Sequence, residues 1–307
     1  MRGNLLSLSE QVDRLAESLG EGNYRVGTGL PLIDMLCGGP APGEIFTIVG
    51  RSFVGKSLIA QNIVYNNREK PSIFFSLEMP TNQALIRLYA LWKDENAEHL
   101  QRRIDEGDMP LDFWDMEQEF PYHRIVGEQG VTIERMTDYV NAFRHDLQMN
   151  PAFVVIDYLE LVNNAKTSGE GYLATESTIT ALKSWAVEEN LRVFLIHQAN
   201  KSEPSWLPPT EDSPRNGGYT ESDFMVGAWR PHMNPEMAPG ERRYYKDKIN
   251  FNVIKNRAYF KLAEEITMKI SPSLRLVGQY ERTKHDEQSA EEAQELMRTW
   301  QTIEADT

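Results

Sequence analysis

Hydrophobic residues alternate between two patterns along the central part of this 307-residue chain. One pattern is a short continuous apolar run, and the other places apolar residues at helical spacing. The continuous runs are residues 45–49, 73–77, 153–156 and 193–196, and the helical segments are 58–64, 84–92 and 179–188. Apolar strands that alternate with helices indicate a parallel sheet covered on both faces. The sequence therefore predicts an α/β domain with a doubly wound, mostly parallel sheet.

The N-terminal residues have the pattern of one amphipathic helix. Ser7 and Glu10 form a capping-box pair at its start. Its apolar stripe, spaced by four, three and four residues, consists of Leu8, Val12, Leu15 and Leu19. Because a lone helix cannot bury such a stripe, we expect it to dock either on its own domain or on a neighbouring chain.

The C-terminal residues form an acidic segment with a second capping-box pair, Ser289 and Glu292. This segment either packs as a helix on its own domain or recruits a partner. The sequence thus predicts an N-terminal helix in residues 1–22, a main domain in 23–283 and an acidic tail in 284–307. Within the main domain, segments 201–218 and 231–243 are rich in proline, glycine and polar residues, which predicts loops.

Composition narrows the class of protein. A hydrophobic fraction of 40% and a charged fraction of 25% are typical of a folded globular chain. The net charge of −14 argues against a protein that coats nucleic acid with its whole surface, although a local basic site is compatible with it. Cys37 is the single cysteine, which excludes an internal disulfide and a thiolate zinc cluster. No apolar run is long enough for a membrane span or export signal, so we expect a cytoplasmic protein.

The segment Gly50–Ser57, GRSFVGKS, matches the phosphate-loop pattern. A predicted strand enters this segment and a predicted helix leaves it, so the loop amides and the helix N-terminus point at one place. This arrangement binds polyphosphate, with Lys56 at the outer phosphates and the Ser57 hydroxyl at Mg²⁺. The predicted nucleotide contacts are Gly50, Arg51, Ser52, Phe53, Val54, Gly55, Lys56, Ser57 and Leu58.

Two acidic residues follow predicted strands. Asp157 ends the apolar run 153–156, where an acid typically holds the magnesium ion of a phosphate-loop enzyme. Tyr158 follows it, so a glutamate that activates water is not adjacent to Asp157. Glu78, after the run 73–77, is the alternative, although it is also compatible with an ordinary acid at a strand end.

Lys255 and Arg257 lie two residues apart in a predicted strand, 251–257. Side chains at this spacing share one face of a strand. Two like charges on one face repel each other unless an anion lies opposite. The pair therefore indicates either a solvated edge or a cationic site facing an anionic group.

Several motifs in order resemble the RecA-like ATPase domain of DnaB-type replicative helicases. The segment FSLEM, residues 75–79, is similar to the family's second motif, and DYLEL, residues 157–161, is similar to its DYLQL motif. Residues 182–186, LKSWA, resemble the helix that follows, and HQANK, residues 197–201, stands where the family has SQLNR. Thr28, Gly29 and Asp34 resemble the segment that enters the domain. The resemblance extends from about Thr28 to Tyr280 and implies a RecA-like fold.

This resemblance implies a role for each matched residue. Glu78 would polarise the attacking water, Asp157 would hold Mg²⁺, and Arg87 would pack beside the adenine of ATP. Gln198 would sense the γ-phosphate and pass its state to the loop that begins at Lys201. The residues implied to bind single-stranded DNA in that loop are Arg215, Asn216, Gly217 and Gly218.

Lys255 and Arg257 resemble the lysine and arginine of the family's KQR motif, which reach a neighbouring subunit's γ-phosphate. The resemblance thus implies catalytic sites shared between subunits of a homo-oligomeric ring, a hexamer in the family's manner, that moves five-prime to three-prime on DNA. It also implies replication partners such as a loader, primase or polymerase. A chain that starts near the ATPase domain would lack the primase-contacting N-terminal domain, as small helicases of phages or plasmids do, and would act in the bacterial host cytoplasm.

The sequence departs from the family pattern where Glu160 replaces a glutamine and His197 replaces a serine. It also departs where Ala258 follows Arg257, because the family often has a glycine after its KQRN motif. The alternative function is a RecA-fold ATPase that works as a nucleotide-gated assembly or regulatory module without unwinding DNA. Both functions need ATP, Mg²⁺ and the same phosphate loop. They differ in whether the loops at 163–174 and 201–218 bind single strands.

Overall fold

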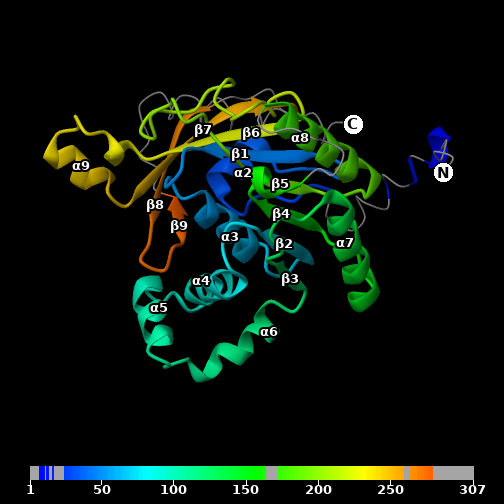
Figure 1. Cartoon of the computed structure of the whole chain (residues 1–307), viewed down its shortest axis with the longest axis horizontal. Helices are drawn as coiled ribbons and strands as arrows, with labels where there is room; N and C mark the ends of the chain where they lie inside the picture. The colour runs from blue at the N-terminus through cyan, green and yellow to red at the C-terminus, as the bar shows by residue number, and fades with distance from the viewer. Residues whose placement is uncertain are drawn as a thin grey trace, which may run out of the picture.

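The computed structural model describes residues 7–10, 12, 13, 16, 24–163, 172–258 and 263–278. Its centre is a nine-stranded sheet with the order β3-β2-β4-β5-β1-β6-β7-β8-β9 (Figure 1). The strands are β1 (Ile45–Gly50), β2 (Ser72–Ser76), β3 (His123–Val126), β4 (Phe153–Asp157), β5 (Val193–Gln198), β6 (Phe224–Trp229), β7 (Lys248–Asn256), β8 (Ala263–Ile270) and β9 (Leu276–Gly278).

Strands β1 to β6 pair in parallel, and β7, β8 and β9 extend the sheet in antiparallel fashion. The predicted doubly wound, mostly parallel sheet is therefore confirmed. Because β1, β2, β4 and β5 lie inside the sheet, their carboxyl ends converge on one edge. Ligands of open α/β sheets bind outside the carboxyl ends of such strands.

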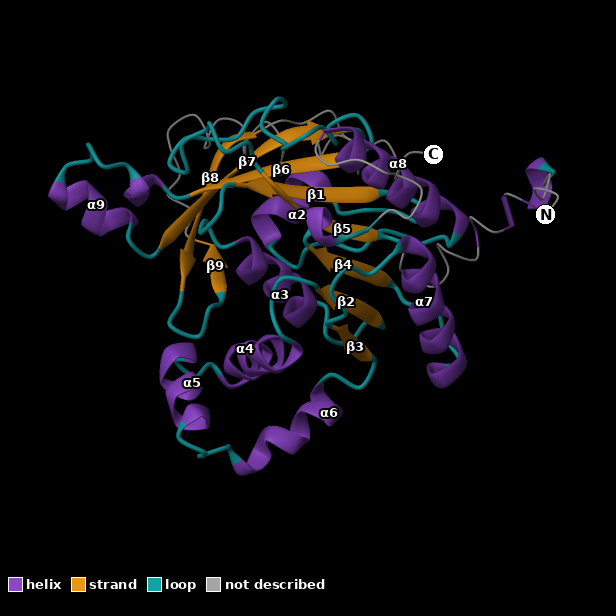
Figure 2. Ribbon diagram, in the orientation of Figure 1, coloured by secondary structure: helices purple, strands orange, loops and turns teal. Residues whose placement is uncertain are grey.

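Helices cover both faces of this sheet (Figure 2). They are α2 (Pro31–Cys37), α3 (Lys56–Asn66), α4 (Thr81–Lys93), α5 (Ala97–Asp105), α6 (Met116–Glu119), α7 (Ile133–Leu147), α8 (Tyr172–Glu188) and α9 (Pro239–Tyr245). Alternate residues of a strand pack on opposite faces, so Phe46 joins the core beneath α3 and α4 while Ile45 joins the core beneath α7 and α8. Two buried faces explain why the strands are continuously apolar.

The segment that enters the domain is held by one carboxylate. Asp34 Oδ1 accepts hydrogen bonds from the backbone N–H and the hydroxyl of Thr28, both at 2.6 Å. Asp34 Oδ2 accepts the backbone N–H of Gly29 at 2.8 Å. The three residues that resemble the family's entry segment therefore form one turn.

One predicted loop contains more structure than expected. Segment 231–243 holds a 3-10 turn, η3 (Pro231–Met233), and most of α9. Proline at the first turn of a helix costs no hydrogen bond, since the amide there has no partner within the helix. Pro239 therefore begins α9, and the proline content that predicted a loop instead marks a helix start. In Figure 1, α9 projects from one end of the molecule beyond β7 and β8.

The predicted capping box near the N-terminus is confirmed. The Glu10 carboxylate accepts the Ser7 backbone N–H at 2.7 Å, and the Ser7 hydroxyl accepts the Glu10 backbone N–H at 3.2 Å. Leu8 and Val12 of this helix are 81% and 61% exposed. Leu15, Leu19 and the tail at 284–307 lie outside the described residues. Among the helices of the described residues, none has the length and apolar character needed to cross a membrane.

Candidate nucleotide-binding site

The phosphate loop joins the end of β1 to the start of α3, as predicted. The backbone turns through left-handed conformations at Phe53 (φ 66°) and Gly55 (φ 105°). A Cβ atom at Gly50 would lie 2.7 Å from the carbonyl oxygen of Ala228 on β6, so this position accepts only glycine without a shift of the sheet. Lys56 is buried, and its Nζ donates to the Arg51 carbonyl at 2.9 Å inside the loop.

Asp157 lies at the end of β4 next to the phosphate loop. Its side chain is buried, with 1% of the residue exposed, and neither carboxylate oxygen has a hydrogen-bond partner. Burial raises the pKa of Asp157 to about 6; the nearby Ser57 hydroxyl opposes this shift and the Glu78 charge adds to it. An unpaired buried carboxylate is costly, which is expected where a cation supplies the missing partner.

Glu78 lies two residues beyond β2, the neighbour of β4 in the sheet. The backbone amides of Leu77 and Glu78 both donate to the Asp157 carbonyl, at 2.8 and 3.2 Å. Glu78 is exposed. Burial lowers the pKa of Lys56 and raises the pKa of Asp157, and the Glu78 charge opposes the first shift and adds to the second. The structure thus brings together the lysine and the two acids that the sequence placed at one site.

Arg87 faces the acidic side of this group. Burial lowers the pKa of Arg87, and the charges of Asp157 and Glu78 oppose this effect. The guanidinium therefore lies close enough to both carboxylates to interact with them. Its predicted contact with adenine stays a prediction.

Gln198 ends β5 opposite Gly50 of β1 in the parallel register. The Gln198 carbonyl accepts the backbone N–H of Arg215 at 2.8 Å. The Ala199 amide donates to the Gly50 carbonyl at 3.0 Å, and the Asn200 amide donates to the Ser213 carbonyl at 2.8 Å. Backbone hydrogen bonds therefore connect the phosphate loop to the predicted DNA loop through β5.

The predicted DNA loop is tightly folded around left-handed residues. Asn216, Gly217 and Gly218 have φ values of 63°, 96° and 106°. Gly218 is buried, and the Arg215 backbone N–H donates to the carbonyl of Gln198 at the end of β5. The loop thus returns to the carboxyl edge of the sheet, where the phosphate loop also lies. Residues 164–171 of the other predicted DNA loop lie outside the described residues.

Two residues noted only as departures from the family pattern contact each other in the structure. His197 Nδ1 lies 3.5 Å from Glu160 Oε1, although the two residues are distant in the sequence. Burial raises the pKa of Glu160, but the hydrogen bond and charge of His197 together with backbone N–H groups outweigh it, so the pKa is lowered overall. Sequence reasoning did not predict a contact between Glu160 and His197, because that contact depends on the pairing of β4 with β5.

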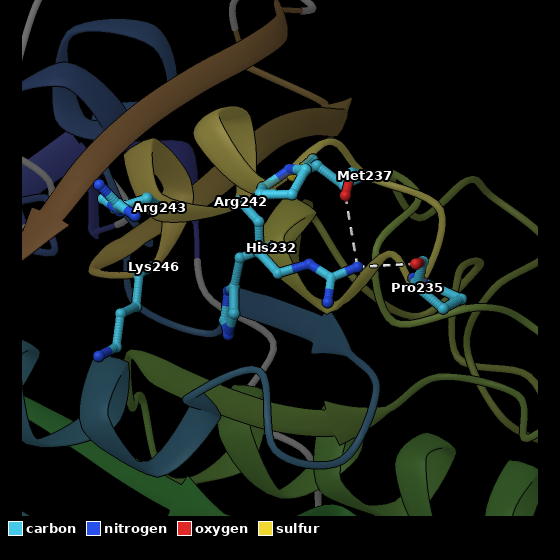
Figure 3. Close-up of a pocket in the computed structure, with 7 residues that line it drawn as sticks. His232, Pro235, Met237, Arg242, Arg243 and Lys246 are labelled. Carbon is cyan, nitrogen blue, oxygen red and sulfur yellow. Dashed lines mark hydrogen bonds between the residues drawn. The ribbon is translucent and has the colours of Figure 1, made fainter.

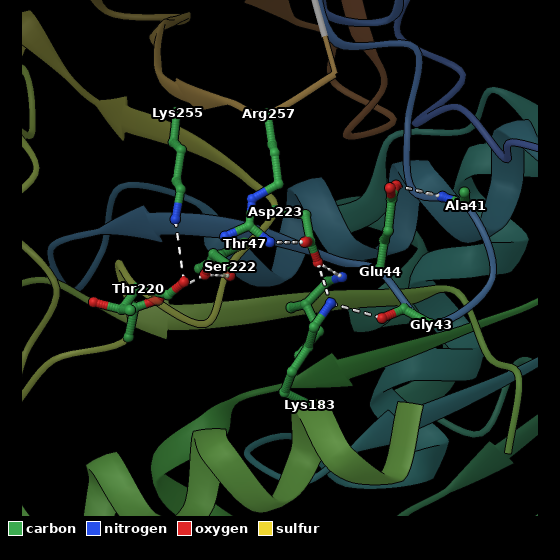
Figure 4. Close-up of polar contacts among 12 residues, drawn as sticks. Ala41, Gly43, Glu44, Thr47, Lys183, Thr220, Ser222, Asp223, Lys255 and Arg257 are labelled. Atoms are coloured by element: carbon green, nitrogen blue, oxygen red, sulfur yellow. Dashed lines mark hydrogen bonds and ion pairs between the residues drawn. The ribbon is translucent and has the colours of Figure 1, made fainter. Parts of the chain in front are cut away.

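Lys255 and Arg257 are held by groups of their own chain (Figure 4). Lys255 Nζ donates to the carbonyls of Tyr219 and Thr220 at 2.6 and 3.2 Å. Arg257 pairs with the buried carboxylate of Asp223 at 2.8 Å, and its side chain remains 58% exposed. An anion therefore lies opposite Arg257, and Asp223 is the member of this cluster that the sequence did not indicate. Arg257 lies one residue beyond the end of β7, which is Asn256.

A separate pocket of about 650 Å³ lies between η3 and α9 (Figure 3). Its lining includes His232, Arg243 and Lys246, together with Arg242, whose guanidinium donates to the carbonyls of Asn234 and Pro235. We place the nucleotide site at the phosphate loop instead, since the buried lysine and the unpaired carboxylate converge there.

The residues at the phosphate loop fit a nucleotide with a divalent cation. No cluster of three or more histidine, cysteine and acidic side chains gathers as metal ligands in the part of the chain that the structure describes. Mg²⁺ commonly takes one or two protein oxygens and completes its shell with phosphates and water. Ser57 and Asp157 offer that ligand set. Fold and site together define a RecA-like nucleotide-binding domain with a phosphate loop.

Comparison with known proteins identifies the family. The family model of the DnaB-like helicase C-terminal domain matches residues 25–257, and the chain belongs to this family. The replicative DNA helicase DnaB of Buchnera aphidicola subsp. Schizaphis graminum is 25% identical over 231 residues, which cover 69% of this chain and 47% of that protein. DnaB of Haemophilus influenzae is 26% identical over 239 residues, covering 71% and 49%. The chain thus spans about half the length of these relatives.

Solved structures share the fold. The ATPase domain of G40P superimposes with a TM-score of 0.71 at 17% identity, over 89% of this chain and 99% of that one. A DnaB-like replicative helicase, solved in a study of its interactions with primase, superimposes with a TM-score of 0.69 at 18% identity, over 90% and 67%. The prediction of a RecA-like domain of DnaB type is therefore confirmed.

Proposed function

We propose that this protein is an ATP-dependent DNA helicase that assembles into a ring, moves along single-stranded DNA and separates the duplex during replication. The observation that carries this proposal is the convergence of Lys56, Asp157 and Glu78 beside the loop that contains Arg215. A nucleotide site and a candidate strand-binding loop then share one edge of the sheet, joined by backbone hydrogen bonds through Gln198.

Each side chain has a defined task in ATP hydrolysis. The backbone of residues 50–57 and the Lys56 ammonium hold the phosphates, and Lys56 exchanges its bond to the Arg51 carbonyl for a phosphate oxygen. Ser57 and Asp157 hold Mg²⁺, which neutralises charge on the phosphates. Glu78 is exposed beside Asp157 and orients the attacking water. Phosphoryl transfer needs alignment and charge neutralisation more than covalent chemistry from the protein.

Lys255 and Arg257 complete the site of a neighbouring subunit. Two observations support this role. Arg257 is exposed, and its ion pair with Asp223 fixes the guanidinium at the surface. A heterologous contact of this kind closes into a ring when its rotation permits, and family resemblance favours a hexamer. An isolated subunit then hydrolyses ATP slowly.

DNA binding belongs to the loop of Arg215, Asn216, Gly217 and Gly218. Arg215 forms no ion pair among the described residues, so its charge is available for a phosphate of the strand. Several copies of this loop around a ring track the backbone despite the net charge of −14. Replication proteins that load or accompany a helicase are the expected partners.

The test combines two measurements on the intact chain. The ATPase rate is measured with and without a single-stranded oligonucleotide, and unwinding is measured on a forked duplex, with Lys56→Ala as the inactive control. We expect stimulation by the oligonucleotide and ATP-dependent strand separation. Hydrolysis without stimulation or unwinding, over a range of magnesium and salt concentrations, points instead to a nucleotide-gated module.

A further inference from the structure

A buried acid–imidazole pair lies between the phosphate loop and the candidate DNA loop. Glu160 is in the 3-10 turn η2 (Leu159–Leu161) that follows β4, and His197 is the penultimate residue of β5. His197 has no exposed surface. Its Nε2 lies 3.0 Å from the Gly217 carbonyl oxygen, and its Nδ1 lies 3.5 Å from Glu160 Oε1. The imidazole therefore connects the turn after β4 to the loop after β5.

Both groups that face the imidazole are acceptors when the carboxyl is ionised. A carbonyl oxygen always accepts, so Nε2 carries the hydrogen that bonds to Gly217. Nδ1 then meets Glu160 favourably only if one proton lies between them, on the ring or on the carboxyl. Glu160 Oε2 and His197 Nδ1 have no hydrogen-bond partner among the described residues, so the 3.5 Å approach of Nδ1 to Oε1 is the polar contact that joins the two side chains. Removing either side chain leaves the other one buried without this contact.

Glu160 also reaches the nucleotide site. Its Oε1 accepts the backbone N–H of Gln198 at 3.1 Å. Burial lowers the pKa of Lys56, and among the acids that oppose this shift the charge of Glu160 has the largest effect. Because Gln198 pairs with Gly50 of the phosphate loop, the Glu160 carboxylate connects this edge of the sheet to His197.

We propose that Glu160 and His197 are positioning residues that couple the occupancy of the phosphate loop to the conformation of the Arg215–Gly218 loop through the Gly217 carbonyl. This inference rests on the proposed function, since it assigns the route by which nucleotide binding changes the affinity for single-stranded DNA. Gly218 has little room to move independently, because a Cβ atom there would lie 2.9 Å from Ile179 and 3.8 Å from His197 Nε2. A displacement of His197 is thus transmitted to the loop.

The test measures coupling rather than either affinity alone. The dissociation constant of a fluorescent single-stranded oligonucleotide is measured by anisotropy with and without a saturating non-hydrolysable ATP analogue and Mg²⁺. The ratio of the two constants reports the coupling, and coupled sites typically show ratios of about 5 to 150. The wild-type protein is expected in this range.

Glu160→Gln and His197→Ser are each expected to reduce the ratio to below about 2, because each breaks the pair. The double variant Glu160→Gln/His197→Ser removes both members of the pair together and is expected to recover part of the ratio. Glu188→Gln, which removes an exposed charge at the end of α8, is the matched control and keeps the wild-type ratio. Glu160→Asp retains the charge with a shorter reach and replaces either single variant that does not fold.

The possible outcomes distinguish a failure of this proposal from a failure of the proposed helicase function. Single variants that retain the wild-type ratio overturn the role of the pair and leave the helicase assignment intact. The ratio in the single variants could instead fall only in proportion to a loss of thermal stability or of analogue binding, with no recovery in the double variant. That result would show that the pair has a merely structural role, and it would also overturn the proposal. A wild-type protein that binds neither the analogue nor the oligonucleotide overturns the proposed function itself.

Discussion

The Arg257 guanidinium lies 2.8 Å from Asp223 Oδ1, and the other oxygen of this carboxylate lies 2.6 Å from Lys183 Nζ. Asp223 Oδ2 also accepts the backbone N–H of Ile45 at 2.9 Å, so the carboxylate is fixed to the start of β1. Figure 4 shows Arg257 and Lys183 approaching Asp223 from opposite sides. The arginine is thereby held at the end of β7 with its side chain still exposed, which suits a cation that serves a neighbouring subunit.

Arg257→Ala is expected to lower the turnover of assembled protein by about 10³- to 10⁵-fold, the range typical of an arginine supplied to a γ-phosphate. Arg243→Ala, which removes an exposed cation from α9, is the matched control and retains activity. The readout is the steady-state ATPase rate with assembly verified by light scattering.

Mixing subunits that carry two different variants tests whether each catalytic site is formed by two chains. Arg257→Ala subunits mixed with Glu78→Ala subunits should regain part of the ATPase activity, because some interfaces combine an intact Glu78 with an intact Arg257. Absence of any rescue in mixed rings of verified composition counts against a shared site.

The affinity for Mg²⁺ with an ATP analogue should fall as the pH is lowered through about 6. The pKa of Asp157 is raised from 3.8 to about 6, chiefly by burial, so the carboxyl holds its proton below this pH. Mg²⁺ requires the ionised carboxylate, and its binding releases that proton. The affinity is measured with a fluorescent analogue between pH 5 and 8. Asp157→Asn serves as the control. In this variant the pH dependence of the affinity should come only from the titration of the nucleotide itself.

Thermal stability should decrease as the pH falls from about 6.5 to about 4, in part because of His123. Burial is the main cause that lowers the pKa of this histidine from 6.5 to about 4. In that window the unfolded chain binds a proton that the folded chain does not, so acidification favours unfolding. His123→Gln should show a shallower loss of melting temperature over the same range. An unchanged slope would show that His123 does not contribute to it.

Gly50→Ala should destabilise the fold by roughly 1 to 3 kcal/mol, because the new Cβ meets the backbone of β6 in a packed interior. Gly240→Ala is the matched control, since a Cβ atom at Gly240 meets nothing within 4 Å. Alanine at that helical position is expected to be neutral or to stabilise by up to about 1 kcal/mol. Denaturant unfolding of both variants gives the comparison, and equal stabilities would contradict it.

The sequence by itself determined the elements whose pattern is local. The apolar runs predicted β1, β2, β4 and β5 to within two residues at each end, because strands buried on both faces are predominantly apolar. The phosphate loop and the Ser7–Glu10 capping box were equally predictable, since their residues interact within a few positions of each other. In contrast, β3, β8 and β9 are short or half-exposed and lack so clear a pattern.

Only the tertiary structure decided which distant residues meet. The pairing of β4 with β5 places Glu160 against His197, and the pairing of β1 with β6 places Asp223 at the start of β1, within reach of Arg257 and Lys183. The sequence contains all of these residues but not the order of the strands. Periodicity reports which face of an element is buried, whereas neighbours in a sheet depend on how every element packs at once.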